Sequence, residues 1–415
     1  MSSAFPAHVP PELVLDVKWY GLEDADGDPN ANLAKLHGGR ELFYIPKNDR
    51  NPFGTWVLTR YDDIQKVFGD TQNFTSNYIS GFNVLAGVDQ LLIPVELDPP
   101  DHTKYKTFLM PYFSRARILE LEPVMRQGVD SVIDEIIDTG EADIVPCGYK
   151  MMAAVWCELV GAPIEKSDLY IRFLFQVIHQ YDPMIRFTCA REMLDAMKDL
   201  YHTNKDKPGK GLINAFINRQ VDGESPSEAE CSGFILFMFL AGMDTMGSST
   251  AWILRYLAQN PDRRHALRDN PQTISAFVEE MLRRYSVVST NRFVKQDVVV
   301  RGVTLKKGDN ILLSTPMACM DADKFECPQS VDTERTARHM AFGFGPHFCI
   351  GAAVARAQLP IMVETWLQRI PDFEVKPGVA LTAHVGDVIG LDSLPLVWPV
   401  PSTTQYGKHS RRIKP

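Results

Sequence analysis

Near its C-terminal end the chain reads Phe342-Gly-Phe-Gly-Pro-His-Phe-Cys349-Ile-Gly351, which sets one cysteine between glycines and a segment that favours a helix. Gly345 and Gly351 permit backbone conformations or close approaches that a Cβ atom would block, so peptide N–H groups can turn towards the sulfur. The residues after Cys349 are good helix formers, which places the sulfur at a helix N-terminus, where unpaired N–H groups stabilise anions. The stretch therefore predicts a cysteine held as a thiolate.

A thiolate in this setting is a suitable ligand for haem iron, because cysteine binds iron only as the anion. Phe342 is expected to shield the sulfur from solvent, and N–H donors aimed at it temper its electron donation. The other six cysteines form no Cys-x-x-Cys pair and have no histidine nearby at zinc-ligand spacing. We interpret them as small buried hydrophobic residues, not as a metal knuckle or a disulfide framework.

Length and composition indicate one large soluble domain. The chain has 415 residues, 45% of them hydrophobic and 23% charged, with a formal net charge of −9. No linker interrupts the middle, so residues 1–402 are predicted to form a single domain, and the polar, basic segment 403–415 a disordered tail. The negative charge disfavours a nucleic-acid partner. The N-terminus has no signal-peptide pattern and the apolar run 234–243 is too short to span a bilayer, so we expect a cytoplasmic protein without a membrane partner.

A long central helix is the second feature of the sequence. Ser227-Glu-Ala-Glu230 reads as a capping box, and helix-compatible sequence continues to Asn260-Pro261. About 33 residues at 1.5 Å each make a helix of roughly 50 Å, which is long enough to cross the molecule. Its centre, residues 234–241, is apolar on every side, so the helix is expected to be buried all round.

Three poor helix formers, Gly242, Asp244 and Thr245, follow directly on that apolar stretch. A buried carboxylate needs a partner, because an unpaired one is costly. The threonine hydroxyl can bond the carbonyl of Ala241 and open the helix locally, which leaves a groove for a small molecule. From these residues alone, a kink with a satisfied polar pair is an equal interpretation.

Taken together, the two features resemble the cytochromes P450. Residues 342–351 match the family pattern Phe-x-x-Gly-x-x-x-Cys-x-Gly, and residues 241–245 match Ala/Gly-Gly-x-Asp/Glu-Thr. The resemblance implies a mainly helical fold with small β-sheets, in which the long central helix lies over the haem. It also implies haem b as the cofactor, Cys349 as its iron ligand, and a catalytic role for Thr245 and Asp244 in delivering protons to dioxygen.

The resemblance assigns further residues to supporting roles. Glu280 and Arg283 lie on one helical face, and a surface ion pair is the ordinary interpretation. In the family this pair is instead buried and joins a second arginine, here Arg335, in a structural triad that fixes the cysteine-bearing loop. The same resemblance implies contacts to haem from His102, Arg292, His347, Phe342, Gly345 and Gly351. For each of the two histidines and Arg292, an ordinary surface residue is an equal interpretation, and Lys106 stands where close relatives often carry arginine.

Similarity to the camphor 5-monooxygenase group implies a terpenoid-sized substrate that is camphor-like, cineole-like or a norisoprenoid. For each residue of the implied pocket, plain core packing is an equal interpretation. Gln90 stands where the camphor enzyme has a tyrosine that bonds its substrate, and Gln358 replaces a glutamate proposed in proton relay. Pro360 is expected to kink the helix after the cysteine. The pocket residues are Gln90, Phe237, Leu240, Ala241, Val288 and Val388.

Electrons must come from a partner, since neither Gly-x-Gly-x-x-Gly nor a P-loop occurs in the chain. In the resembling group the donor is a [2Fe–2S] ferredoxin fed by an NADH-dependent reductase. Lys104, Lys106, Arg115 and Arg117 are expected to attract it, with a solvated helix face as an equal interpretation. Two rival functions are a haem-thiolate peroxygenase, which the Asp244–Thr245 pair disfavours, and a non-enzymatic haem sensor, which the lack of a signalling segment disfavours.

Overall fold

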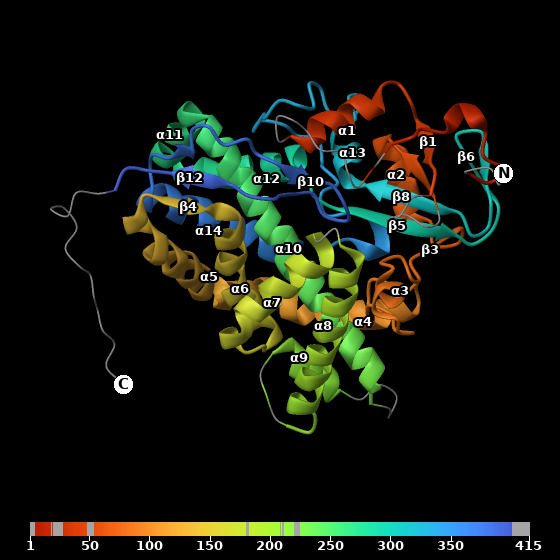
Figure 1. Ribbon diagram of the computed structural model, residues 1–415, viewed down its shortest axis with the longest axis horizontal. Coiled ribbons are helices and arrows are strands. Elements are labelled where there is room, and N and C mark those ends of the chain that lie inside the picture. The colour runs from red at the N-terminus through yellow and green to blue at the C-terminus, as the bar shows by residue number, and fades with distance from the viewer. Residues whose placement is uncertain are drawn as a thin grey trace.

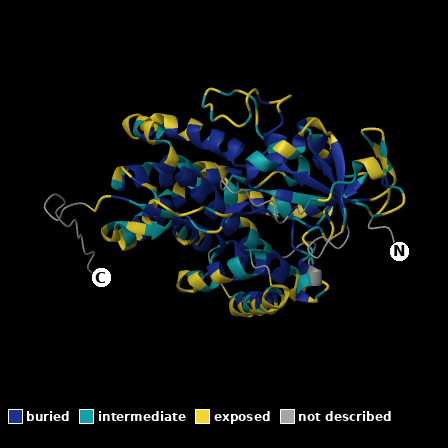
Figure 2. Cartoon of the chain, turned by 45° about the horizontal axis from the view of Figure 1, so that its top comes forward, coloured by how far each residue is buried: buried dark blue, intermediate teal, exposed yellow. Residues whose placement is uncertain are grey.

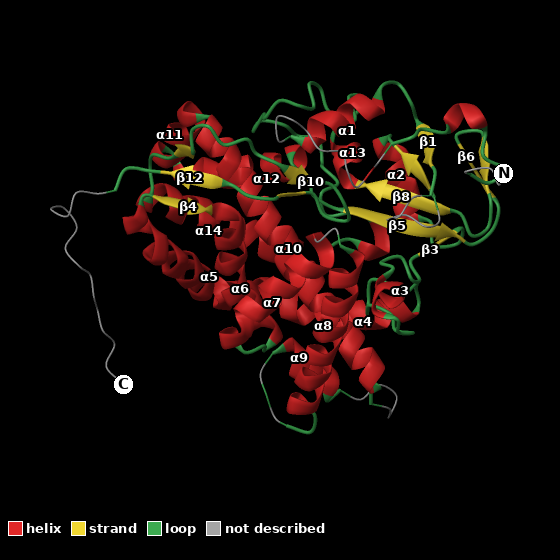
Figure 3. Ribbon diagram, in the orientation of Figure 1, coloured by secondary structure: helices red, strands yellow, loops and turns green. Residues whose placement is uncertain are grey.

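The computed structural model describes residues 5–17, 19, 28–47, 54–179, 182–207, 209, 211–219 and 225–400. Helices make up 55% of the chain and small sheets lie at its sides, which confirms the predicted fold class (Figures 1 and 3). The tail 403–415, predicted to be disordered, lies outside the described residues, and the single domain over residues 1–402 stays a prediction. The helices are α1 (Pro29–His37), α2 (Tyr61–Gly69), α3 (Phe82–Ala86), α4 (Asp101–Leu109), α5 (Arg115–Ile136), α6 (Ile144–Val160), α7 (Ser167–Leu174), α8 (Pro183–Asn204), α9 (Leu212–Ile217), α10 (Glu228–Gln259), α11 (Pro261–Asp269), α12 (Ile274–Arg284), α13 (Thr315–Cys319) and α14 (Ala352–Arg369).

Helix α10 is the long central helix that the sequence predicts, and it crosses the middle of the molecule (Figure 1). The capping box is formed, with Ser227 N donating to Glu230 Oε2 at 2.8 Å and Glu230 N donating to Ser227 Oγ at 3.2 Å. Among the described helices only α10 is long and apolar enough to cross a membrane, and 72% of its apolar window is buried inside the protein. It is therefore the core helix of the fold. Figure 2 shows that buried residues gather in the middle of the molecule and exposed ones at its outer edges.

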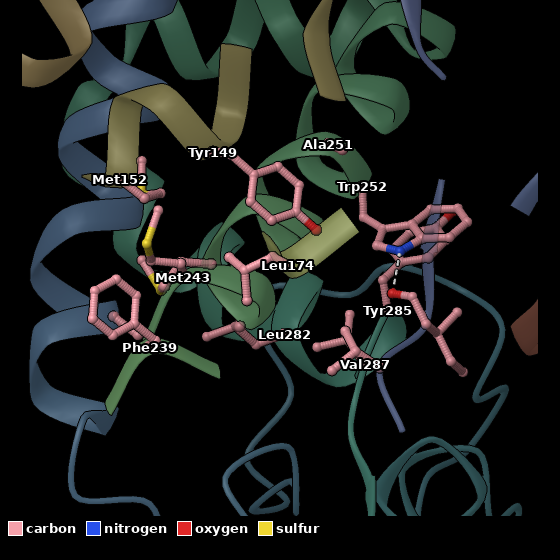
Figure 4. Close-up of a cluster of buried hydrophobic side chains, with 14 of the residues drawn as sticks. Tyr149, Met152, Leu174, Phe239, Met243, Ala251, Trp252, Leu282, Tyr285 and Val287 are labelled. Carbon is pink, nitrogen blue, oxygen red and sulfur yellow. Dashed lines mark hydrogen bonds between the residues drawn. The ribbon is translucent and has the colours of Figure 1, made fainter. Parts of the chain in front are cut away.

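Two glycines let α10 and α6 approach closely. A Cβ atom on Gly148 would lie 3.3 Å from the carbonyl oxygen of Gly247, and one on Gly247 would lie 2.8 Å from the ring of Tyr149. Beside this contact, the indole N–H of Trp252 donates to the carbonyl of Ile389 at 3.2 Å and its ring stacks on Tyr285 (Figure 4). The approach brings the hydroxyl of Tyr149 to the centre of α10.

Four sheets occur in the described part of the chain, and two of them carry residues of the site. The five-stranded sheet has the order β1-β2-β8-β5-β3, and its strand β5 carries Arg292. In the small β10-β11 sheet, His384 pairs with Gly390. The strands are β1 (Leu42–Ile45), β2 (Thr55–Leu58), β3 (Phe74–Thr75), β4 (Glu141–Asp143), β5 (Ser289–Val294), β6 (Val298–Val300), β7 (Val303–Leu305), β8 (Asn310–Ser314), β9 (Glu374–Val375), β10 (Ala383–His384), β11 (Gly390–Leu391) and β12 (Pro395–Val397).

Two sequence expectations concern single residues of this fold. Cys327 is exposed, so the prediction of a buried residue is wrong there; it occupies a surface turn at φ +46°, where the backbone turns its side chain away from the core. Helix α14 continues through Pro360 to Arg369, so the proline does not end the helix. The predicted kink at that position stays a prediction.

Candidate active site

The cysteine loop, residues 342–351, is held by its own backbone and by α14. Cys349 N donates to the carbonyl of Phe342 at 2.9 Å, and α14 begins at Ala352 with Gly351 at its N-cap. Gly345 has φ +69°, and a Cβ atom there would lie 2.8 Å from the backbone oxygen of Phe68. Only glycine therefore fits that turn against the end of α2.

The sulfur of Cys349 lies at the start of α14, where its surroundings have opposing effects on the pKa of the thiol. Burial raises the pKa of the Cys349 thiol, while the N–H groups of Gly351 and Ala352 and the charge of Lys106 lower it. Desolvation outweighs these donors, yet the cysteine is not fully enclosed, because its side chain is exposed on one side. A bound metal ion supplies the positive charge that makes such a thiol an anion, so the donor set fits an iron ligand.

Side chains around the cysteine loop fix its position. The guanidinium of Arg356 lies 4.6 Å from the ring centroid of Phe342, and Phe342 packs edge-on against Phe348. Lys106 Nζ donates to the carbonyl of Phe348 at 3.0 Å and to that of Pro346. Lys106 thus binds the loop itself, which resolves what a lysine does at this position.

The sequence-predicted triad is assembled and buried. Arg283 Nη2 lies 2.7 Å from Glu280 Oε1, and Arg283 Nε lies 2.9 Å from Glu280 Oε2, a two-pronged ion pair. Arg335 Nε reaches Glu280 Oε1 at 3.2 Å, and Arg283 also donates to backbone carbonyls of Cys319 and Ser330. With 1% and 4% of their side chains exposed, Arg283 and Glu280 are no surface pair. The triad ties α12 to the segment that leads into the cysteine loop.

Three nitrogen-bearing side chains, His102, Arg292 and His347, lie close together at the cysteine loop. The two histidine rings are 4.1 Å apart, and His347 Nε2 lies 3.1 Å from Ser76 Oγ. Burial lowers the pKa of His347 to about 2 and that of His102 to about 4, and the charge of Arg292 lowers both further. Burial likewise lowers the pKa of Arg292 to about 10. Buried donors that disfavour one another's charge fit an acidic ligand such as the haem propionates.

Helix α10 has one side that protein does not cover. Between Cys231 and Arg255 every residue is buried except five. Four of these are spaced three or four residues apart and so lie along one side of the helix, whereas Gly242 packs against Trp156 of α6. Ala241 is exposed at the centre of this stripe, although it lies in the core helix. The five are Phe237, Leu240, Ala241, Gly242 and Thr245, and four of them are residues that the sequence assigns to catalysis or to the substrate pocket.

The acid–alcohol pair, Asp244 and Thr245, lies at one end of that stripe. Thr245 Oγ1 donates to the carbonyl of Ala241 at 3.1 Å, as the sequence predicts. Asp244 is fully buried, and its Oδ1 accepts hydrogen bonds from Tyr149 at 2.5 Å and from His179 Nε2 at 2.8 Å. Burial raises the pKa of Asp244, but the charge and hydrogen bond of His179 and the Tyr149 hydroxyl outweigh it, so the net pKa is lowered.

Sequence reasoning required a partner for Asp244 but did not identify Tyr149 or His179. Tyr149 comes from α6 and His179 ends the π-helical turn Phe175–His179, so both are distant from Asp244 along the chain. A buried aspartate in an apolar helix was the only available signal, and it names no partner.

The structure separates the predicted pocket residues into groups. Val288 and Val388 meet in an isolated antiparallel bridge, whereas Phe237, Leu240 and Ala241 lie on the stripe of α10. Gln90 lines a cavity of about 600 Å³ together with Tyr105, Arg219 and Glu230, and none of the other five lines it. The Gln90 amide nitrogen is buried and has no hydrogen-bond partner among the described residues.

Cations expected to attract a ferredoxin are partly paired within the protein. Lys104 lies 3.1 Å from Asp101, and Arg117 lies 2.9 Å from Glu120 and 3.5 Å from Glu158. Their charge is therefore less available to a partner than the sequence suggests.

The comparisons with known proteins agree with this geometry. Residues 184–382 match the family model described as Cytochrome P450. A relative named probable cytochrome P450 127A1, from Sinorhizobium fredii, is 32% identical over 405 residues and covers 96% of this chain and 97% of its own. Mycinamicin IV hydroxylase/epoxidase, from Micromonospora griseorubida, is 28% identical and covers 91% of this chain and 98% of its own. The crystal structure of CYP101J2 superposes with a TM-score of 0.84 at 25% identity, over 96% of this chain and 100% of that one.

The fold and the cysteine loop define a haem-thiolate protein, and the chain belongs to the cytochrome P450 family. It is a monooxygenase of the soluble bacterial type with haem b as its cofactor. The printed names of its relatives point to different substrates, among them mycinamicin IV and vitamin D3.

Proposed function

We propose that this monooxygenase hydroxylates an unactivated C–H bond of a small hydrophobic, monoterpenoid-sized substrate in the cytoplasm, with electrons from a [2Fe–2S] ferredoxin and its NADH-dependent reductase. The proposal is carried by two features of the same chain: a cysteine loop suited to an iron ligand, and a partly exposed stripe of α10 that ends in Asp244 and Thr245. When bound, the haem supplies dioxygen activation and oxygen insertion.

Cys349 holds the iron through its sulfur, and its N–H partners keep that sulfur from being a stronger electron donor. Phe342, Gly345 and Gly351 shape the loop around it. His102, Arg292 and His347 hold the haem propionates, because buried donors without a paired carboxylate are stabilised by an acidic ligand. The buried triad of Glu280, Arg283 and Arg335 keeps the segment before the loop in place.

Asp244 and Thr245, both on α10, would deliver protons to the bound group. The Thr245 hydroxyl is bonded to the carbonyl of Ala241 and so is held on the uncovered side of α10. Asp244 is the nearest carboxyl group along the helix, and its second oxygen, Oδ2, has no hydrogen-bond partner among the described residues. Oδ2 therefore remains able to exchange a proton with a water molecule, while Oδ1 is fixed by Tyr149 and His179.

The apolar residues Phe237, Leu240 and Ala241 favour a compact hydrocarbon frame that is oriented by shape. Val288 and Val388, which meet in an isolated bridge, would add two further apolar side chains to the pocket. Gln90 is kept as a hydrogen-bond donor because its buried amide is unpaired among the described residues, although it lines a cavity that none of the other five pocket residues lines. Resemblance to the camphor 5-monooxygenase group supports the terpenoid size.

A reconstituted assay tests this function. The protein is incubated with a panel of monoterpenoids and norisoprenoids, either with ferredoxin, reductase and NADH or with hydrogen peroxide alone. Hydroxylated product that requires the complete electron-transfer chain supports the proposal. Equal product with peroxide alone would make the protein a peroxygenase, and no product from either system with any panel member would overturn the proposed substrate class.

A further inference from the structure

Four ionisable side chains lie in line between the core of α10 and the protein surface. His179 Nε2 bonds to Asp244 Oδ1 at 2.8 Å, and His384 Nδ1 bonds to Asp392 Oδ1 at 2.8 Å. The two histidine rings join these pairs, with ring centroids 4.1 Å apart and planes at 54°. The four come from separate elements, namely α10, the turn 175–179, β10 and the residue after β11.

Exposure along this line increases from one end to the other. The Asp244 side chain is 0% exposed, His179 and His384 are each 9% exposed, and Asp392 is 44% exposed. Asp392 therefore meets solvent, and the two histidines lie between it and a carboxylate that water does not reach directly. Among the described residues, His384 Nε2 is buried without a hydrogen-bond partner.

We propose that Asp392, His384 and His179 form a proton route from solvent to Asp244. Asp392 is its entrance, and the two histidines act through Asp244 and position it. This inference rests on the proposed role of Asp244 in proton delivery and names the groups that restore its proton.

The proton balance of the route is complete without a further reagent. When Oδ2 of Asp244 gives up a proton, the Nε2–H bond of His179 breaks and an O–H bond forms on Oδ1; a half-turn of the carboxyl group then brings that O–H to the open side. His179 regains a proton from His384, and His384 regains one from solvent through Asp392. No hydrogen bond joins the two rings, so this middle transfer uses a bridging water molecule or a rotation of one ring.

His179 and His384 are suited to pass a proton because they do not both carry a positive charge. Burial lowers the pKa of His384, and the charge of His179 lowers it further, while Asp392 opposes both effects. Two imidazoles at this distance do not carry positive charge together, so the route passes one proton at a time. A proton that arrives at His384 is therefore displaced towards His179.

The groups around the two histidines favour transfer of a proton from His384 through His179 to Asp244. His179 faces Asp244 on α10, Tyr149 on α6 and His384 on β10, and Asp392 acts on it through space. Burial and the neighbouring carboxylate raise the pKa of Tyr149 well above its ordinary value, so its hydroxyl donates a bond without releasing a proton.

Gly390 leaves the space that the ring of His384 occupies. It pairs with His384 across the β10-β11 ladder, and a Cβ atom on it would lie 2.7 Å from both Cε1 and Nε2 of that ring. The same Cβ would lie 3.1 Å from Ser248 Oγ on α10. The unpaired nitrogen of His384 therefore points across a glycine towards the central helix.

The test uses Asp392→Asn in the intact holoenzyme, because this half-exposed site tolerates an isosteric change. Product formed per NADH is expected to fall by about tenfold, since a positioned proton donor contributes at least that much. The pH profile of product formation is expected to shift to lower pH, because loss of the carboxylate lowers the pKa of His384 further. The second variant, His384→Gln, is expected to give the same loss.

A readout independent of turnover uses nitrogen NMR of the histidine rings in the reduced, carbon monoxide-bound protein. Asp392→Asn is expected to lower the titration midpoint of His384. The matched control is Asp372→Asn, which removes a surface carboxylate bonded to His265 at 3.1 Å and is expected to change neither readout. Unchanged product yield and pH profile in Asp392→Asn, with the wild type active, would overturn the route.

Failure of the proposed function looks different from failure of the route. If the protein is not a ferredoxin-dependent monooxygenase, the wild type itself forms no product with the electron-transfer chain. If only the route is wrong, the wild type and Asp392→Asn are equally active and equally coupled.

Discussion

The cysteine loop and the acid–alcohol pair, which we propose face the haem from opposite sides, are built in different ways. The loop is fixed by local means: a left-handed glycine at Gly345, a backbone bond from Cys349 to Phe342, and the start of α14. Asp244 is fixed by side chains from α6 and from the turn 175–179, both remote in sequence. Contacts between residues near in sequence can be recognised as a motif, whereas contacts between residues remote in sequence depend on the whole fold.

The largest expected effect concerns the support of the loop. Glu280→Ala leaves Arg283 buried without its partner, and breaking one side of a buried ion pair costs about 3–5 kcal/mol. Chemical denaturation followed by far-UV circular dichroism is expected to show that loss. The matched control is Glu122→Ala, which removes an exposed partner of Arg126 and is expected to cost less than about 1 kcal/mol. Equal losses in both variants would mean that the triad contributes no more than a surface pair.

A glycine substitution tests how local the loop is. Gly345→Ala meets a backbone oxygen at 2.8 Å and a φ of +69°, so a destabilisation of about 1–3 kcal/mol is expected. Gly302→Ala is the matched control, because its φ is +77° but nothing lies within 4 Å of the new Cβ atom. Thermal unfolding of both variants separates the contact from the backbone strain, and a larger loss in Gly302→Ala would contradict the packing argument.

Substitution of Thr245 is expected to change how much product forms per NADH consumed, with little change in stability. Thr245→Ala removes the hydroxyl on the uncovered side of α10 and is expected to lower product per NADH by about tenfold, with the electrons appearing as hydrogen peroxide. Thr245→Ser keeps the hydroxyl and is expected to restore most of the coupling. The measurement compares NADH consumed, peroxide formed and product formed in the same reaction. Full coupling in Thr245→Ala would exclude the proton-delivery role.

The smallest expected effect is a pH dependence of the free energy of unfolding, which arises from Glu279 on α12. His339 Nε2 and the guanidinium of Arg356 bond to Glu279; burial raises the pKa of Glu279, but these partners outweigh it and lower the pKa from 4.5 to about 2. A carboxylate whose pKa is lowered by folding contributes stability above pH 4.5, and this stability is lost as the pH falls towards 2. Because Glu279 is 39% exposed, the contribution is about 1 kcal/mol.

Glu279→Gln is therefore expected to lower the free energy of unfolding at pH 7 and to reduce its decline between pH 4.5 and 2. Urea unfolding at a series of pH values measures this difference. A variant that declines as steeply as the wild type would show that other carboxyl groups control acid unfolding.

Sequence reasoning recovered what local patterns encode. The capping box at Ser227 and Glu230, the extent of α10 and the helix after Cys349 follow from spacing and propensity, and all three are present. Spacing placed Glu280 and Arg283 on one helical face, but the triad with Arg335 and its burial followed only from the family resemblance, because they depend on contacts remote in sequence.

Contacts that depend on tertiary packing were not recoverable. Nothing in the local sequence of His179 or Tyr149 indicates that they meet Asp244, and the bonds of Lys106 to the cysteine loop depend on how α4 packs. The surroundings of Gln90 were not predictable either. Its cavity is also lined by Arg219 and Glu230, which are remote in sequence and which no local pattern brings next to it.

The absorption spectrum of the reduced, carbon monoxide-bound protein tests the central claim, ligation of the haem iron by Cys349, most directly. We predict the strongly red-shifted Soret band of a thiolate-ligated haem in the wild type and its loss in Cys349→His. Persistence of that band in Cys349→His, or an imidazole-type spectrum in the wild type, would contradict the account.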